Sequence, residues 1–397
     1  MEPSHFHIVF TGLSGIPETP SAPVQRIIHL GKALASENWK VTYLNRLPLK
    51  HQPGSVEESF SGLKNINIED SLKHRNSNNN KIGRLAWKIM AFPAEFFKLM
   101  GIHRKNRIDV LFIYTQYFGL VLFYSIIAKL LGCKTVLSYV EFRSGISTRN
   151  GFFIRLNDRL FDRYAFCLTN GVNPISHRIE QHVATVCPGK PQIRIPALCD
   201  FSLFNHVTRP DDIDHDYFLF CGTAGYFDVI GKIIKAFLAV NDKNMTKLQL
   251  VISGNDRQLA RIRNDIKGTG EINMVSQIPY SDLVHLYSNA LALVIPLRDI
   301  PQDNYRFPHK ISEYTASKRP IITTNIGEIP FYFKDKESAI ICADTSDTAL
   351  TKAMEWAITY KTRLYEIGEQ GYVVGLKNFS HKCFEVPLHN FLVGLLN

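Results

Sequence analysis

Apolar runs and helix-like stretches alternate along the first half of this 397-residue chain. An apolar run at 6–11 is followed by a loop rich in Gly, Ser and Pro, a helical pattern over 24–36 and a second apolar run at 41–44. This order predicts a strand, a helix and a parallel strand. Further strands are predicted at 110–114, 135–140 and 166–170, with a helix over 118–131.

The second half repeats the alternation. Strands are predicted at 217–221, 248–253, 291–295 and 320–324, and helices at 230–240, 281–288 and 307–317. Segment 208–216 between the halves is rich in aspartate, which is typical of a surface linker. The pattern favours an α/β protein with two doubly wound parallel sheets.

Length and composition support two domains. A chain of this size exceeds one ordinary core, and 45% hydrophobic with 21% charged residues is typical of a globular protein. We expect Rossmann-like domains over 1–206 and 207–375. Residues 376–397 are expected to form a C-terminal helix that packs back on the N-terminal domain.

Charge is distributed unevenly. Residues 1–200 contain 25 Lys and Arg against 14 Asp and Glu, whereas residues 201–397 contain 21 against 22. A basic half attracts anionic partners such as lipid headgroups, lipid diphosphates or nucleic acid. The alternative is a solubility charge without a partner.

The cysteines and the amino terminus point to a cytoplasmic protein. Seven scattered cysteines without C-x-x-C spacing indicate neither a disulfide framework nor a zinc site. The first residues lack a signal-peptide pattern, and the apolar stretch at 110–133 is interrupted by polar residues, so we expect no membrane span.

One stretch of the sequence is typical of segments that bind a membrane surface. Residues 82–107 combine aromatic and basic side chains at helical spacing, which is typical of helices that lie in a membrane interface. We therefore expect peripheral binding to an anionic membrane. The alternative is a core-facing helix whose lysine stems cover apolar surface.

A candidate anion site surrounds Pro308. Proline favours the first turn of a helix, where unpaired N–H groups bind anions. Arg306 and Lys310 add positive charge there, and Glu313 lies on the same helical face as Lys310. Because acidic residues bind ribose hydroxyls in other nucleotide folds, this segment predicts a nucleotide site.

The same segment resembles a known family signature. Seven residues fit, in order and spacing, the nucleotide-sugar signature of retaining GT-B glycosyltransferases of group 1 (family 4): Phe307, Pro308, Lys310, Glu313, Tyr314, Ala316 and Pro320. The resemblance implies a GT-B fold, with two facing Rossmann-like domains and a central cleft. It further implies that Glu313 binds the donor ribose, while Arg306 and Lys310 hold the diphosphate.

Looser similarities extend over most of the chain. Gly12 and Gly15 are similar to the family's glycine-rich first loop, although they can also simply form a turn. Gly222, Thr223 and Gly254 follow predicted strands that resemble those framing the nucleotide in the family, and we expect them at the donor site.

The chain also departs from the family pattern. Tyr305 replaces the first of two signature glutamates, and Thr223 and Asp228 occupy positions that are often basic. Where a first-domain strand often ends in a catalytic His or Asp, Glu141 stands nearest and is our candidate catalytic residue. The alternative is a strand-end carboxylate paired with Arg143.

The resemblance implies a hexosyltransferase-like enzyme that needs no cofactor and no metal. We expect transfer with retention from a nucleotide-diphosphate sugar to a glycan or lipid-linked acceptor, in polysaccharide or glycoconjugate synthesis. The D-x-D patterns in the linker are interpreted as loop charges, and the histidines lack metal-site spacing. Two alternatives stay open: a GT-B nucleotide-sugar epimerase, and a nucleic-acid-binding protein, for which no recognition motif is present.

Overall fold

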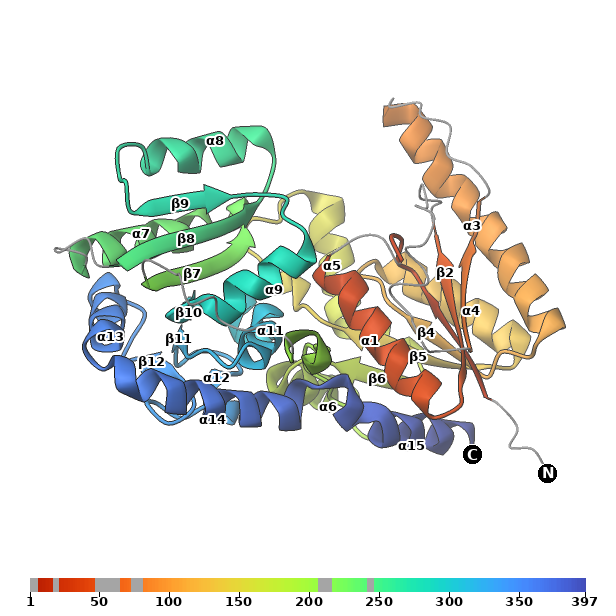
Figure 1. Cartoon of the computed structure of the whole chain (residues 1–397). Helices are drawn as coiled ribbons and strands as arrows, with labels where there is room; N and C mark the ends of the chain where they lie inside the picture. The colour runs from red at the N-terminus through yellow and green to blue at the C-terminus, as the bar shows by residue number, and fades with distance from the viewer. Residues whose placement is uncertain (1–5, 17–20, 47–64, 73–80, 206–215, 241–245) are drawn as a thin grey trace. The chain divides into compact units, whose positions relative to one another are not determined.

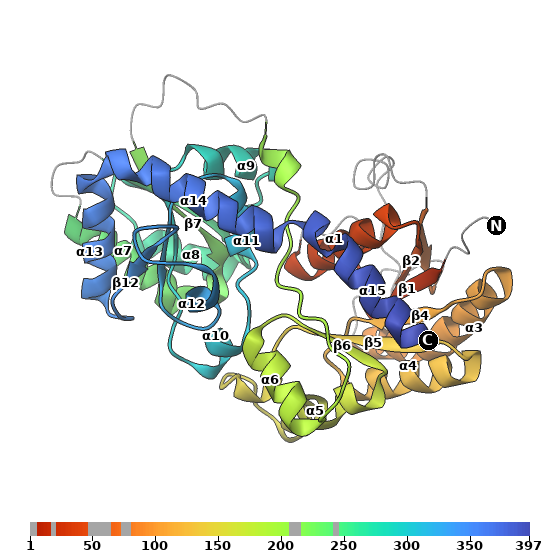
Figure 2. The same ribbon diagram turned by 90° about the horizontal axis from the view of Figure 1, so that it is seen from below.

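The computed structural model describes residues 6–16, 21–46, 65–72, 81–205, 216–240 and 246–397. The chain forms two compact units, one of residues 1–198 with 381–397 and one of residues 199–380 (Figure 1). The boundary expected at 206/207 falls outside the described residues. The last helix, α15 (Glu385–Leu396), packs on α1 (Ala22–Ser36) in the first unit (Figure 2).

The first unit contains a parallel sheet in the order β3-β2-β1-β4-β5-β6. Its strands are β1 (His7–Thr11), β2 (Lys40–Asn45), β3 (Ile66–Asp70), β4 (Val110–Ile113), β5 (Lys134–Tyr139) and β6 (Gly171–Pro174). Its further α-helices are α3 (Lys81–Lys105), α4 (Phe118–Leu131), α5 (Phe152–Tyr164) and α6 (His177–Val186). Every residue of β1 and β4 is buried, which is why these strands appear as continuous apolar runs in the sequence.

The second unit repeats this topology, with the sheet order β12-β11-β10-β7-β8-β9. The strands are β7 (Asp216–Thr223), β8 (Thr246–Ser253), β9 (Ile272–Val275), β10 (Ala292–Ile295), β11 (Ile321–Thr324) and β12 (Ile340–Cys342). The helices are α7 (Phe227–Val240), α8 (Asp256–Asp265), α9 (Tyr280–Asn289), α10 (Pro301–Tyr305), α11 (Lys310–Ala316), α12 (Ile329–Tyr332), α13 (Asp347–Thr359) and α14 (Lys361–Phe379).

In each sheet the first strand along the chain is central, and the order in which later strands are added changes direction beside it. The switch lies between β1 and β4 in the first unit and between β7 and β10 in the second. In open α/β sheets, ligands bind at the carboxyl ends of the strands beside such a switch. The predicted α/β class with two doubly wound sheets is confirmed.

Two predicted elements are wrong in position. The strand expected at 166–170 is a short 3-10 helix, Ala165–Leu168, and β6 begins only at Gly171. Phe166 is buried because its ring stacks on Tyr139 of β5, so packing rather than strand pairing explains the apolar run. The helix expected from 307 begins at Lys310, and the Pro308 carbonyl accepts the N–H of Ile311 at 3.1 Å.

A buried acidic residue lies where β2 meets α3 and α4. Glu95 is fully buried, and its Oε2 lies 2.8 Å from Arg46 Nη1. Its other oxygen accepts the Tyr124 hydroxyl at 2.6 Å. Burial raises the pKa of Glu95 to about 7, against the opposing effect of Arg46 and Tyr124.

We expect Glu95→Gln to flatten the pH dependence of stability. A carboxyl whose folded-state pKa exceeds its unfolded value stabilises the fold at low pH, and this contribution is lost as the pH rises toward the folded pKa. The wild type should lose about 2 kcal/mol from this group between pH 5 and 7, and the variant should not. Urea unfolding across that range measures the difference.

Glu69→Gln is the matched control, because Glu69 pairs with Lys98 of α3 at 2.6 Å but is substantially exposed. This control should keep the wild-type pH profile. A Glu95→Gln profile with the wild-type slope would contradict the prediction.

Candidate functional site

Two arginines and a tyrosine gather at the carboxyl ends of β7 and β10. Beyond β7 the chain turns through Ala224–Tyr226, and Arg298 follows β10. Arg306 donates a hydrogen bond to the Tyr226 hydroxyl, and its guanidinium carbon lies 4.8 Å from the centre of the Tyr226 ring. The Arg298 guanidinium carbon lies 5.3 Å from the same ring. Two guanidinium groups therefore lie beside one aromatic ring at the switch point of the second sheet.

Asp303 holds these arginines in place. Its Oδ2 lies 2.8 Å from Arg298 Nε, and its Oδ1 lies 2.7 Å from Arg306 Nη2. The Asp303 side chain is only 1% exposed. Burial opposes its charge, but the hydrogen bond from Arg298 and the charge of Arg306 hold the pKa of Asp303 below its ordinary value. A second carboxylate, Asp228, lies 3.2 Å from Arg298 and is 57% exposed.

Lys310 and Glu313 form an ion pair on α11. Lys310 Nζ lies 2.8 Å from Glu313 Oε2, and both side chains are largely buried. Burial disfavours the ammonium, but Glu313 outweighs it and raises the pKa of Lys310 above its ordinary value. The predicted placement of these residues on one helical face is what brings them into contact.

The predicted glycine and threonine positions lie at the same edge of the second sheet. Thr223 ends β7, opposite Ser253 at the end of β8. A Cβ on Gly222 would lie 2.7 Å from the Phe220 ring, and one on Gly254 would lie 2.8 Å from Ala224 Cβ. Close packing of the chain therefore explains these glycines without a ligand.

In the first unit, the loop after β1 contains Gly12 and Gly15. Both have positive φ, 90° and 106°, which favours glycine. A Cβ on Gly12 would also lie 2.8 Å from the Tyr114 carbonyl oxygen, just after β4. The alternative interpretation of these glycines, as residues that form a turn, agrees with this geometry.

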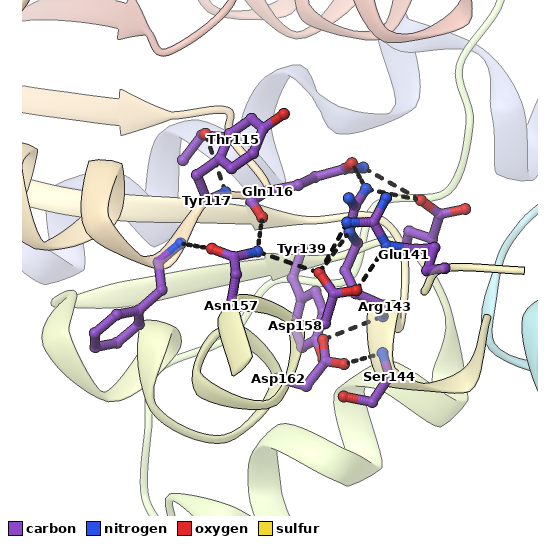
Figure 3. A network of polar contacts seen from close by, with 12 residues as sticks. Thr115, Gln116, Tyr117, Tyr139, Glu141, Arg143, Ser144, Asn157, Asp158 and Asp162 are labelled. Carbon is purple, nitrogen blue, oxygen red and sulfur yellow. Dashed lines mark hydrogen bonds and ion pairs between the residues drawn. The ribbon is translucent and has the colours of Figure 1, made fainter. Parts of the chain in front are cut away.

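Glu141 lies just beyond β5 in a network of polar contacts (Figure 3). Arg143 Nη1 lies 3.4 Å from Glu141 Oε2, as the alternative interpretation expected. Arg143 also donates a hydrogen bond to Gln116 Oε1, and its Nε lies 3.5 Å from Asp158. The Glu141 side chain remains 24% exposed, so one carboxylate is both held by an arginine and accessible.

The sequence alone did not point to Arg298, Asp303 or Tyr226. Arg298 could have been found as a charged residue three positions after an apolar strand, because ligands bind at the carboxyl ends of parallel strands. Asp303 and Tyr226 carried no such signal. The aspartate-rich segment lies, apart from its last residue, outside the described part of the chain.

The described ranges contain neither a metal-binding cluster nor a membrane-spanning helix. No group of three or more His, Cys, Asp and Glu side chains there is placed to hold a metal ion. Likewise, none of the described helices is both long enough and apolar enough to cross a bilayer.

Comparison with known proteins gives a family match for the second unit and a fold match for the whole chain. Residues 211–373 match the family model "Glycosyl transferases group 1". No curated protein sequence matches the chain.

The solved structures most similar to the chain include three glycosyltransferases. Sucrose-phosphate synthase from Thermosynechococcus elongatus has a TM-score of 0.75 at 16% identity, covering 98% of this chain and 99% of that one. HepE from Anabaena, in complex with UDP and glucose, has a TM-score of 0.71 at 13% identity, covering 98% and 100%. WaaG, a glycosyltransferase involved in lipopolysaccharide biosynthesis, has a TM-score of 0.64 at 12% identity, covering 97% and 99%. The two six-stranded sheets are thus those of the GT-B fold.

Proposed function

We propose that this GT-B glycosyltransferase, whose residues 211–373 match the group 1 family model, transfers a hexose with retention from a nucleotide-diphosphate sugar to a glycan or lipid-linked acceptor. The observation that carries the proposal is the concentration of cationic side chains at the switch point of the second sheet. Arg298, Arg306 and Lys310 all lie between β10 and β11, and the two arginines lie beside Tyr226, which follows β7. Diphosphates bind best where several charged donors converge.

UDP is the nucleotide that we propose. The Anabaena structures contain UDP and UDP-glucose. Lys310 and Arg306 would bind the diphosphate, and Glu313 would accept hydrogen bonds from the ribose hydroxyls. The Lys310–Glu313 ion pair holds both side chains in place before the donor arrives. When UDP binds, each of the two side chains exchanges its charged partner for a group of the ligand. Because both side chains are already fixed, binding costs little additional conformational entropy.

The same cationic side chains would also stabilise the leaving group. When the bond between sugar and diphosphate breaks, negative charge develops on the phosphate oxygens, and fixed cations stabilise it. These side chains replace a divalent metal in that role, so we propose that no metal or cofactor is needed. Glu141 is proposed as the catalytic carboxylate, with Arg143 fixing its orientation.

A donor screen with a product assay tests this function. UDP-sugars are expected to raise the unfolding temperature more than GDP-sugars, because a ligand that binds only the folded state stabilises it. UDP should then be released in the presence of a glycan or lipid-linked acceptor, and release should continue in EDTA. Conversion of the donor sugar without an acceptor would favour the epimerase, and a need for Mn²⁺ would contradict the metal-free site.

We further propose that α3 places the first unit on an anionic membrane, in support of polysaccharide or glycoconjugate synthesis. Apolar side chains on this helix are strongly exposed, with Ile89 at 61% and Phe97 at 70%. Arg104 and Lys105 near its end are also exposed. Phe92, which was expected at the interface, is only partly exposed and packs edge-on against Phe123. The side chains of residues 81–88 lie outside the described part.

Ile89→Ser with Phe97→Ser is expected to reduce cosedimentation with anionic vesicles several-fold. Removing apolar side chains weakens interfacial insertion, whereas each basic contact contributes about 1 kcal/mol that salt screens. Val373→Ser, at an apolar position on α14 that is 55% exposed, is the control and should bind as the wild type does. Equal binding of all three proteins would exclude α3 as the membrane surface.

A further inference from the structure

A concavity of about 660 Å³ lies in the first unit, beside the polar network of Figure 3. It is formed by the loop after β5, by α5 and by α6. Its lining includes Phe142, Ser144, Arg159, Arg163, Tyr164 and His182, together with the nearly buried carboxylate of Asp162. Its walls thus combine aromatic rings with two guanidinium groups.

The acidic residues of α5 face inward, and their charges are already satisfied. Asp158 accepts hydrogen bonds from Arg149 Nε at 2.6 Å and Nη2 at 3.0 Å, and lies 3.5 Å from Arg143. Asp162 is buried, where it accepts the Tyr139 hydroxyl at 2.8 Å and the Ser144 N–H at 2.6 Å. Burial raises the pKa of Asp162. Asp162 lines the concavity, but neither carboxylate forms an ion pair with Arg159 or Arg163.

Arg159 and Arg163 follow these aspartates by one residue and point outward. Both are exposed, and neither forms an ion pair with any of the residues that the structure describes. They are four residues apart on one helix, a spacing at which like charges repel each other. The guanidinium carbon of Arg163 lies 5.6 Å from the centre of the Tyr164 ring. Two neighbouring arginines that precede α5, Arg143 and Arg149, are both paired with Asp158.

We propose that this concavity binds the phosphate group of an anionic acceptor. Arg159 and Arg163 would bind the phosphate through their planar donors, which match phosphate oxygens in pairs. Phe142 and Tyr164 would contact the uncharged body of the ligand. A bound phosphate also removes the repulsion between the two arginines, which no side chain of the described structure does. That the ligand is the acceptor rests on the proposed function; the anion site itself does not.

Calorimetry with glucose 6-phosphate as probe, and glucose as its neutral counterpart, tests the site at saturating UDP. UDP occupies the donor site and so restricts the probe to other sites. We expect the wild type to bind glucose 6-phosphate and not glucose. The double variant Arg159→Gln, Arg163→Gln should bind the phosphate ester at least tenfold more weakly, with an unchanged unfolding temperature and unchanged UDP affinity.

Arg155→Gln is the matched control. Arg155 precedes Arg159 by one turn of α5 and donates to Asn150 at 2.9 Å, outside the concavity. This variant should bind the probe as the wild type does. Equal affinity of the double variant and the wild type for glucose 6-phosphate would overturn the proposal. So would a wild type that binds anionic vesicles through these arginines but does not bind glucose 6-phosphate. Failure of the wild type to bind UDP would instead overturn the proposed function.

Discussion

Lys310→Ala is expected to raise the dissociation constant of UDP about 30-fold or more. The variant loses a charged donor to the diphosphate, and it leaves Glu313 without its partner near the phosphate oxygens. Truncating one member of a buried, hydrogen-bonded charge pair typically costs about 2 to 5 kcal/mol in binding. Calorimetric titration with UDP measures the loss.

Comparison with uridine separates the two members of the ion pair. Uridine has the ribose but no phosphate, so Lys310→Ala should not affect its affinity. Glu313→Ala should weaken UDP and uridine alike, by about 1.5 to 3 kcal/mol, because it removes a charged acceptor of ribose hydrogen bonds. Tighter UDP binding by Glu313→Ala would show that Glu313 only neutralises Lys310, and would contradict its ribose role.

Lys318→Ala is the control for this pair. Lys318 lies just beyond α11 and forms an ion pair with Glu369 at 3.2 Å, but it is half exposed. Exposed pairs contribute about 0 to 1 kcal/mol to stability, and this one should contribute nothing to UDP affinity. UDP affinity that stays unchanged in Lys310→Ala would remove Lys310 from the proposed donor site.

Asp303→Asn is expected to lower the free energy of unfolding by about 3 to 5 kcal/mol. The substitution leaves Arg298 and Arg306 beside a neutral group in a largely buried position, and breaking a buried ion pair by removing one partner has this cost. The pKa of Asp303 lies below its ordinary value, so its contribution is present above about pH 4 and is lost as the pH falls through the folded-state pKa. Denaturant unfolding at pH 7 should give the full difference.

Asp228→Asn provides a direct comparison, because Asp228 also pairs with Arg298 but is mostly exposed. Its replacement should cost less than about 1 kcal/mol. Equal destabilisation by the two substitutions would show that burial does not determine how much each ion pair of this cluster contributes to the free energy of unfolding. It would also weaken the view that Asp303 holds the arginines in place for a ligand.

The sequence by itself determined the layer structure and the local part of the proposed nucleotide site. The helix predicted at 118–131 is α4 with the same bounds, and the strand predicted at 110–114 is β4 to within one residue. A buried parallel strand appears in the sequence as an apolar run of about five residues. An amphipathic helix appears as regularly spaced apolar residues over about 15 residues. Lys310 and Glu313 meet because residues three apart on a helix are neighbours, so their contact is local.

Tertiary structure alone decided which distant charges meet. Arg306 reaches Tyr226 across 80 residues, and Arg298 reaches Asp228 across 70, since β7 and β10 lie side by side in the sheet. The strand β9 went unpredicted because only its first residue is buried, so it leaves no apolar run, and β12 because three residues are too few to show one. The contact of Glu141 with Gln116 likewise joins segments that follow two different strands, β5 and β4. That Arg159 and Arg163 form no ion pair with any described residue depends on the directions that α5 gives their side chains. The local sequence pattern indicates which positions are buried. Which buried charges pair with one another depends on the order of the strands in the sheet, and no local pattern contains that order.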